Sequence, residues 1–263
     1  MKEQSSRRKP LLLAHRGTSL LAPENTAPAF DFAMRHGADV LEIDVRLSSD
    51  NEVMVFHDET LERTTNGTGL VREHTEATLK QLDAAYYFSL DGQLAARGTG
   101  VSMLSLIELL ECYPIRVNID IKDSDEQAVV AVANAVLNLQ AADRCVLASF
   151  HDLQVERCRD LYPQLRTGMS LSEVKRYYFR FVTGQLCGDR HTAGLFQVPV
   201  SYYWLPLSGR RFIRSIHRGG GEINYWTIND PVQMKQLIAR GADGIVTDRA
   251  DLACEVISSS VID

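Results

Sequence analysis

Short runs of apolar residues alternate with longer amphipathic stretches along the whole chain. We expect each short run to form a strand, giving eight strands at residues 11–15, 40–45, 116–121, 145–149, 165–169, 194–198, 222–226 and 244–246. Helices are expected between them at residues 27–36, 105–111, 124–139, 152–161, 172–182, 211–218 and 231–240. Continuous apolar strands separated by helices are typical of a parallel sheet that helices cover. Eight such units favour an α/β fold of the (β/α)8 type, the TIM barrel, over an open doubly wound sheet.

One segment interrupts the alternation after the second predicted barrel strand. Residues 52–57 read as an additional strand that follows a turn, and the polar stretch at about 58–103 is too long for an ordinary loop. We therefore expect a single barrel domain over residues 1–263, with this inserted segment at the carboxyl end of the barrel. Insertions in that place commonly wall one side of an active site.

Composition and charge exclude several classes of protein. No run approaches the roughly 18 apolar residues of a membrane-spanning helix, and the apolar stretch near the amino terminus is too short for a secretory signal. We therefore expect a cytoplasmic protein. The net charge of −6 disfavours nucleic acid as the principal partner. Five cysteines without a C-x-x-C pair indicate neither a disulfide framework nor a thiolate zinc site.

Charged side chains gather where the predicted barrel strands end. Because the carboxyl ends of barrel strands share one mouth, and residues two apart on a strand face the same side, we expect these groups to converge on one cavity. They comprise two histidines, three carboxylates, an arginine and a lysine: His15, Arg16, Glu42, Asp44, His57, Asp120 and Lys122.

The three carboxylates indicate a metal site. Glu42, Asp44 and Asp120 on adjacent strands would repel one another unless a cation lies among them. Oxygen ligands favour a divalent Mg²⁺ or Ca²⁺ ion over zinc. The alternative is a salt-bridge network in which Lys122 and Arg16 neutralise these acids.

The paired histidines favour cleavage of a phosphodiester. One imidazole, of His15 or His57, would remove a proton from the attacking oxygen while the other protonates the leaving alkoxide. Arg16 and Lys122 would neutralise charge on the phosphoryl oxygens, and the planar fork of arginine suits a phosphate. A barrel that binds phosphorylated ligands without turnover would not need this pair. A Schiff-base isomerase or aldolase is disfavoured because the carboxylates would keep Lys122 protonated.

Several motifs extend these observations along nearly the whole chain. They include Ala14-His15-Arg16-Gly17, Pro23-Glu24-Asn25-Thr26, Leu41-Glu42-Ile43-Asp44-Val45, Val55-Phe56-His57-Asp58, Asn118-Ile119-Asp120-Ile121-Lys122, Trp226-Thr227-Ile228-Asn229 and Asp243-Gly244-Ile245-Val246-Thr247-Asp248. In this order they resemble the motifs of the glycerophosphodiester phosphodiesterase family. The resemblance implies a metal-dependent (β/α)8 hydrolase that cleaves a glycerophosphodiester, such as glycerophosphocholine or glycerophosphoethanolamine, to glycerol 3-phosphate and an alcohol.

The resemblance also implies roles for individual residues. The histidines that match His15 and His57 act as general acid and base, and a glycerol hydroxyl serves as internal nucleophile through a cyclic phosphate. The carboxylates that match Glu42, Asp44 and Asp120 bind the metal. The family more often has glutamate at the last of these positions. The side chain of Asp120 is shorter by about one methylene, so its carboxylate lies closer to the backbone than a glutamate carboxylate would.

The remaining expectations concern the substrate. Residues that match Arg16 and Lys122 contact the phosphate in the family. Phe150 and Trp226 are expected at strand ends, where they either wall the site or belong to the core. Residues 200–207 look like a loop at the barrel mouth, and its aromatic side chains could meet an acyl chain or a membrane surface. Lysophospholipid substrates, with transient membrane contact, are therefore an alternative to small deacylated diesters.

Overall fold

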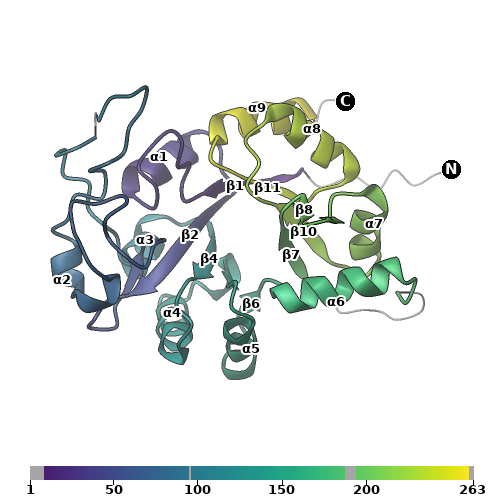
Figure 1. Cartoon of the computed structure of the whole chain (residues 1–263), viewed down its shortest axis with the longest axis horizontal. Helices are drawn as coiled ribbons and strands as arrows, with labels where there is room; N and C mark the ends of the chain where they lie inside the picture. The colour runs from purple at the N-terminus through teal and green to yellow at the C-terminus, as the bar shows by residue number, and fades with distance from the viewer. Residues whose placement is uncertain (1–8, 95, 187–193, 261–263) are drawn as a thin grey trace.

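The structure is a computed structural model that describes residues 9–94, 96–186 and 194–260, and its strands form a ring (Figure 1). Eight parallel strands make this ring: β1 (Leu11–His15), β2 (Val40–Leu47), β4 (Arg116–Ile121), β5 (Cys145–Ala148), β6 (Arg166–Thr167), β7 (Leu195–Val198), β10 (Glu222–Tyr225) and β11 (Gly244–Thr247). They follow chain order around the ring, and β1 lies between β11 and β2. Between β6 and β7 a single parallel bridge joins Gly168 to Leu195. The predicted (β/α)8 barrel is confirmed.

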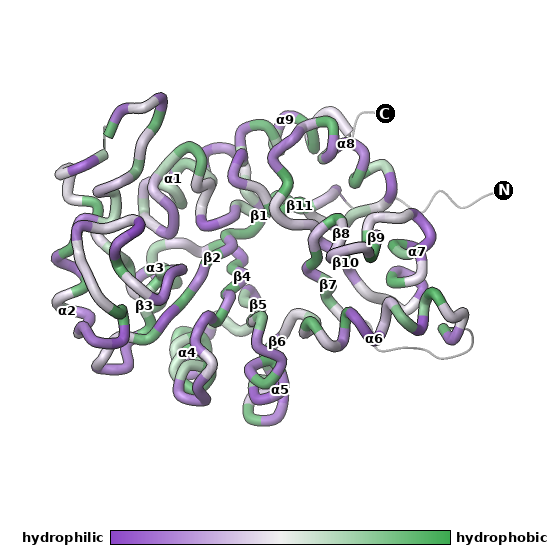
Figure 2. Tube along the Cα trace, in the orientation of Figure 1, coloured by the Kyte–Doolittle hydropathy of each residue, from purple (hydrophilic) through white to green (hydrophobic). Residues whose placement is uncertain are grey.

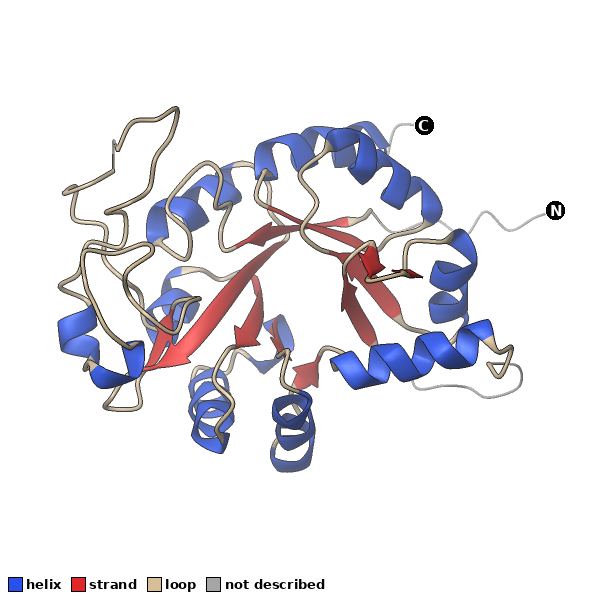
Figure 3. Cartoon of the chain, in the orientation of Figure 1, coloured by secondary structure: helices blue, strands red, loops and turns tan. Residues whose placement is uncertain are grey.

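Helices lie outside the ring of strands (Figure 3). They are α1 (Ala27–Arg35), α3 (Leu106–Cys112), α4 (Glu126–Asn138), α5 (Asp152–Leu161), α6 (Leu171–Val182), α7 (Arg210–Arg218), α8 (Pro231–Arg240) and α9 (Ala250–Ser260). Ser105 and Ser170 form capping boxes at α3 and α6, which explains why these helices begin one residue after each serine. α9 was not predicted from the sequence, because this helix follows the last strand and is not bounded by two predicted strands as the other helices are.

Apolar side chains between strands and helices form the main core, and Figure 2 shows hydrophilic residues interspersed with hydrophobic ones along strands such as β2 and β4. Phe30, Ile119 and Phe212 are among its fully buried members. The inside of the barrel below the mouth is partly polar: Gln197 Nε2 donates to Asn118 Oδ1 over 2.6 Å. Among the described residues, no helix is long and apolar enough to cross a bilayer.

The inserted segment packs beside the barrel through a strand outside the ring. β3 (Val53–Val55) pairs antiparallel with β2, with Val55 opposite Val45, and lies within the expected strand at 52–57. The short helices η1 (Val71–Glu73) and α2 (Glu76–Leu79) follow it. An apolar cluster of its own, including Phe56 and Leu61, fills this segment. That residues 1–263 form one domain stays a prediction.

The stretch expected as a loop at the mouth is a small hairpin. β8 (Ser201–Tyr202) pairs antiparallel with β9 (Leu205–Pro206), and Tyr203 and Trp204 form the tip. Tyr225 Oη donates to the backbone oxygen of Leu207 over 2.7 Å just after β9. This bond fixes the base of the hairpin to the barrel wall.

The turn after β1 requires glycine at position 17. Gly17 has φ +80°, and an added Cβ would lie 2.7 Å from Phe30 Cδ1. We expect Gly17→Ala to lower the free energy of unfolding by about 2–5 kcal/mol, because backbone strain and overpacking add. Gly92→Ala is the control: its φ is +76° with nothing within 4 Å, so we expect only about 1–2 kcal/mol. Urea unfolding measures both, and equal losses would contradict the steric argument.

Candidate active site

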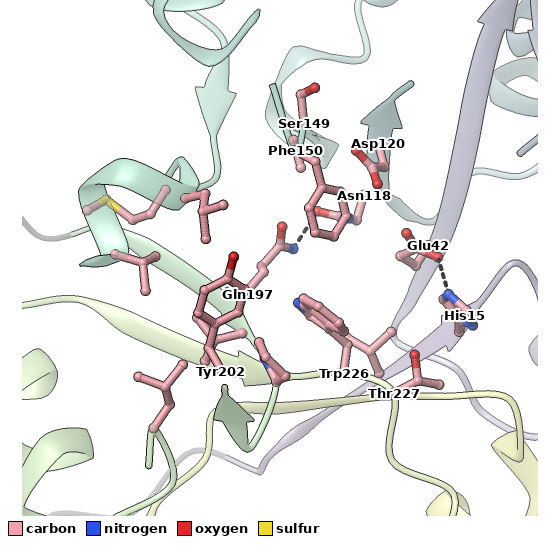
Figure 4. Close-up of a pocket in the computed structure, with 18 of the residues that line it drawn as sticks. His15, Glu42, Asn118, Asp120, Ser149, Phe150, Gln197, Tyr202, Trp226 and Thr227 are labelled. Atoms are coloured by element: carbon pink, nitrogen blue, oxygen red, sulfur yellow. Dashed lines mark hydrogen bonds and ion pairs between the residues drawn. The ribbon is translucent and has the colours of Figure 1, made fainter. Parts of the chain in front are cut away.

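One cavity of about 360 Å³ lies at the carboxyl ends of the barrel strands (Figure 4). All nine site residues predicted from the sequence line it: His15, Arg16, Glu42, Asp44, His57, Asp120, Lys122, Phe150 and Trp226. They come from β1, β2 and β4, from the segment after β3, and from the ends of β5 and β10. The structure therefore brings the whole candidate set together.

The three carboxylates face one another across two neighbouring strands. The parallel register places Asp44 of β2 opposite Asp120 of β4, and Glu42 lies two residues before Asp44 on the same face. One oxygen from each carboxylate lies within 4.8 Å of the others. Asp120 Oδ1 is buried and has no hydrogen-bond partner among the described residues. An unsatisfied buried oxygen within an all-oxygen cluster fits a hard divalent cation.

Lys122 and Arg16 neutralise part of this cluster. Lys122 Nζ lies 2.8 Å from Asp44 Oδ1 and 2.6 Å from Asp120 Oδ2, and Arg16 Nε lies 3.0 Å from Asp44 Oδ2. Burial acts to lower the pKa of Lys122, but Asp120 and Asp44 more than offset it and raise that pKa above its usual value. The amine stays cationic, which disfavours the Schiff-base alternative.

Within the part of the chain that the structure describes, one of the three carboxylates has no lysine or arginine as a salt-bridge partner. Among the described residues, Glu42 has no lysine or arginine side chain within ion-pair distance, and His15 Nε2 lies 4.0 Å from its Oε2. Burial and the neighbouring charge of Asp44 raise the pKa of Glu42 to about 7. A network of Lys122 and Arg16 alone therefore does not balance the three acids, and a divalent ion would supply the missing charge.

A carboxylate that the sequence analysis did not single out holds His15. Asp248 follows β11, and because Ala14 pairs with Thr247, Asp248 lies beside the end of β1. His15 Nδ1 lies 2.6 Å from Asp248 Oδ1, and Asn229 donates to Oδ2 of the same carboxylate over 2.8 Å. Burial acts to lower the pKa of His15, but Asp248 and Glu42 more than offset it and raise that pKa.

His57 is held by its own neighbour. His57 Nδ1 lies 2.6 Å from Asp58 Oδ1, and Arg63 of the inserted segment binds the same carboxylate. Arg63 also donates to Glu24 over 2.6 and 2.8 Å, so one guanidinium ties the insertion to the loop after β1. Burial lowers the pKa of His57, and Asp44 and Asp58 offset this only in part. The two imidazoles thus have pKa values shifted in opposite directions, which is typical of an acid–base pair.

Asn25 supports the carboxylate cluster instead of capping a helix. Thr26 occupies the position before α1, whereas Asn25 Nδ2 donates to Asp44 Oδ2 over 3.1 Å. On the same loop, Glu24 accepts a hydrogen bond of 2.9 Å from Arg16. The loop after β1 therefore orients Arg16 and Asp44.

Phe150 and Trp226 wall the cavity. Phe150 is 59% exposed, and its ring meets the Trp226 ring edge to face with centroids 5.7 Å apart. Lys122 Nζ lies 5.4 Å from the Phe150 centroid. Tyr202 lies on the far side of Trp226 from Glu42 and His15 (Figure 4). The apolar lining of the cavity, which we call the apolar lobe, includes Leu171, Val174 and Tyr178 of α6 together with Tyr202, Leu205 and Leu207.

Residues 15–252 match the model of the glycerophosphoryl diester phosphodiesterase family. The chain belongs to this family. It is 33% identical to YhdW of Bacillus subtilis over 245 residues, which cover 91% of this chain and 95% of that one. It is 30% identical to the glycerophosphodiester phosphodiesterase of Caldanaerobacter subterraneus over 251 residues, or 91% of this chain and 94% of that one. The resemblance seen in the sequence is confirmed, and the chain is an enzyme of this family.

A solved structure with a ligand supports the same assignment. The Oleispira antarctica phosphodiesterase in complex with the product sn-glycerol-3-phosphate has a TM-score of 0.76 and 25% identity. The match covers 95% of this chain and 97% of that one. The chain is therefore similar in fold to a phosphodiesterase that was solved with this product.

Proposed function

We propose that this protein hydrolyses small deacylated glycerophosphodiesters to glycerol 3-phosphate and an alcohol, with Mg²⁺ or Ca²⁺ bound to the acidic cluster. Glycerophosphocholine and glycerophosphoethanolamine are the substrates we expect. The observation that carries the proposal is the pair of carboxylate-held histidines on one cavity with three clustered acids. Family membership supports the reaction class. A barrel that only binds phosphorylated ligands is set aside because the family is one of enzymes.

Glu42, Asp44 and Asp120 would hold the metal ion. When bound, the ion supplies Lewis-acid stabilisation of the phosphoryl oxygens. Arg16 and Lys122 are fixed at the edge of the same cluster, where they neutralise charge that accumulates on the phosphate.

The histidines move the protons. One of His15 and His57 takes the proton of the attacking glycerol hydroxyl, and the other gives a proton to the oxygen of the leaving alcohol. The hydroxyl attack forms a cyclic phosphate, and water then opens the ring to glycerol 3-phosphate. Because the nucleophile belongs to the substrate, its proximity to phosphorus lowers the entropic cost of the first step.

Phosphorus NMR tests the proposal. Purified protein with glycerophosphocholine and Mg²⁺ or Ca²⁺ should convert the diester resonance to that of glycerol 3-phosphate. Failure to convert either proposed diester with either metal would overturn the proposal. A phosphocholine resonance would also contradict it, because it would place the cleaved bond on the other side of phosphorus.

Asp248 is expected to act by positioning His15. Asp248→Asn keeps the side-chain shape but removes the charge, and we expect kcat for glycerophosphocholine to fall about 10²-fold with little change in KM. Asp243→Asn is the matched control, since Asp243 pairs with His217 over 2.9 Å in a partly exposed position outside the cavity. Steady-state kinetics measure both variants. Similar kcat values for the two would contradict a specific role for Asp248.

Lysophospholipids are a second candidate, favoured by the apolar lobe. Its side chains could bury a single hydrocarbon chain beside the charged part of the cavity. In that case kcat/KM for lysophosphatidylcholine should exceed that for glycerophosphocholine, and Val174→Asp should reverse the order. If the acyl-bearing substrate turns over no better than glycerophosphocholine, this candidate fails.

Two expectations from the sequence remain predictions. The cytoplasmic location is the first of them. The lack of a nucleic-acid partner rests on the net charge of −6.

A further inference from the structure

The tip of the β8–β9 hairpin presents two large aromatic side chains to water. Tyr203 and Trp204 are each 85% exposed, and neither lines the cavity. Exposing adjacent aromatic rings is costly in a monomer unless another surface covers them. Tyrosine and tryptophan are the residues that favour the interface between water and lipid headgroups.

Positive charge is concentrated in the segments that precede and follow this hairpin in the chain, although the whole chain is acidic. Residues 171–186 and 194–218 contain seven lysines and arginines and one acidic residue, Glu173, whereas the chain carries a net charge of −6. Lys175 and Arg176 are exposed near the start of α6, and Lys175 Nζ lies 5.2 Å from the Tyr202 ring of the hairpin. Arg210 and Arg211 are exposed at the start of α7, four and five residues after Pro206. α6 and α7 pack against each other through Tyr177 and Phe212 (Figure 1).

We propose that Tyr203, Trp204, Lys175, Arg176, Arg210 and Arg211 form a docking face for anionic lipid surfaces. Basic residues are attracted to a negatively charged leaflet, and the two aromatic rings can enter its headgroup layer. The occupant is a membrane and not a second copy of the chain, because two such basic faces would repel each other.

The docking face adjoins the apolar lobe. Tyr202 and Leu205 flank the tip in the hairpin, and both line the lobe. Docking would place the lobe next to the lipid layer, from which a single-chain glycerophosphodiester can enter. This delivery step rests on the lysophospholipid candidate under the proposed function, whereas lipid binding itself does not.

Vesicle flotation tests the docking face. We expect the protein to float with vesicles of phosphatidylcholine containing phosphatidylglycerol and to bind vesicles of phosphatidylcholine alone at least tenfold less. Binding should weaken with added salt, because screening reduces attraction between exposed charges. Arg210→Gln with Arg211→Gln should lower binding about thirtyfold, and Tyr203→Ser with Trp204→Ser at least tenfold.

Matched variants separate the face from general surface effects. Arg218→Gln lies at the other end of α7, and Leu161→Ser removes an exposed leucine, 49% exposed at the end of α5. Neither should change binding, and the aromatic double variant should keep full turnover of glycerophosphocholine. No flotation of the unmodified protein, or equal binding to both vesicle types, would overturn the proposal even if a variant failed to fold. A change of oligomeric state without loss of vesicle binding in the aromatic variant would also overturn it.

The two proposals fail independently. A protein that hydrolyses glycerophosphocholine but does not bind anionic vesicles retains the proposed function and loses the docking face. A protein that binds the vesicles without hydrolysing the proposed diesters retains the docking face and loses the proposed function.

Discussion

His15→Ala and His57→Ala are each expected to lower kcat for glycerophosphocholine by about 10²–10⁴-fold, the range that general acid–base groups contribute. Each imidazole is fixed at Nδ1 by a carboxylate 2.6 Å away, so its Nε2 remains for proton transfer. Because both half-steps need an acid and a base, neither histidine can replace the other. Steady-state kinetics with excess metal measure the loss.

His217→Ala is the control for this pair of variants. His217 also lies beside a carboxylate, Asp243, but outside the cavity. Circular dichroism should show the barrel intact in all three proteins. If either His15→Ala or His57→Ala keeps more than a tenth of the original kcat, the assignment of acid–base roles is wrong.

Removal of divalent ions is expected to lower turnover by about 10³-fold or more, since Lewis-acid stabilisation contributes several kcal/mol. Adding back Mg²⁺ or Ca²⁺ should restore activity. Glu42→Gln should show a similar loss at ordinary metal concentrations, because it removes the carboxylate that the salt bridges leave least compensated. Titration calorimetry should show weaker metal binding by this variant.

Glu108→Gln is the corresponding control. Glu108 pairs with Lys80 at 2.7 Å and caps α3, away from the cavity. It should bind the metal ion as the unmodified protein does. Equal activity in chelator-treated and metal-loaded protein would remove the ligand assignment for Glu42, Asp44 and Asp120.

Local rules in the sequence were sufficient to predict the acidic cluster. Glu42 and Asp44 are two apart on a strand, and Asp120 lies on the next barrel strand, so a period of two and parallel packing bring them to one face. The position of His57 does not follow from these rules alone, because β3, the strand before it, lies outside the ring. The pairing of Val55 in β3 with Val45 in β2 brings His57 to the mouth of the barrel. His57 was nevertheless predicted at the mouth, because the additional strand predicted at 52–57 ends at this residue.

Contacts made by closing the barrel could not be predicted in this way. Asp248 reaches His15 from the last strand, and Arg63 joins Asp58 to Glu24 across the insertion. His15 and Asp248 are 233 residues apart and Glu24 and Arg63 are 39 residues apart, so no local pattern marks either of these two pairs. A carboxylate directly after the last barrel strand was nevertheless a signal that Asp248 faces the mouth. The two-residue strands of the hairpin are too short for any hydrophobic period to show.

The central claim is that Glu42, Asp44 and Asp120 together hold a divalent ion in the cavity of the two histidines. Anomalous diffraction from crystals soaked in Mn²⁺, an ion that prefers the same oxygen ligands as Mg²⁺, tests it directly. We predict one strong peak within about 2.0–2.6 Å of an oxygen from each of the three carboxylates. A peak bound elsewhere, or no peak at this cluster at saturating Mn²⁺, would contradict the account.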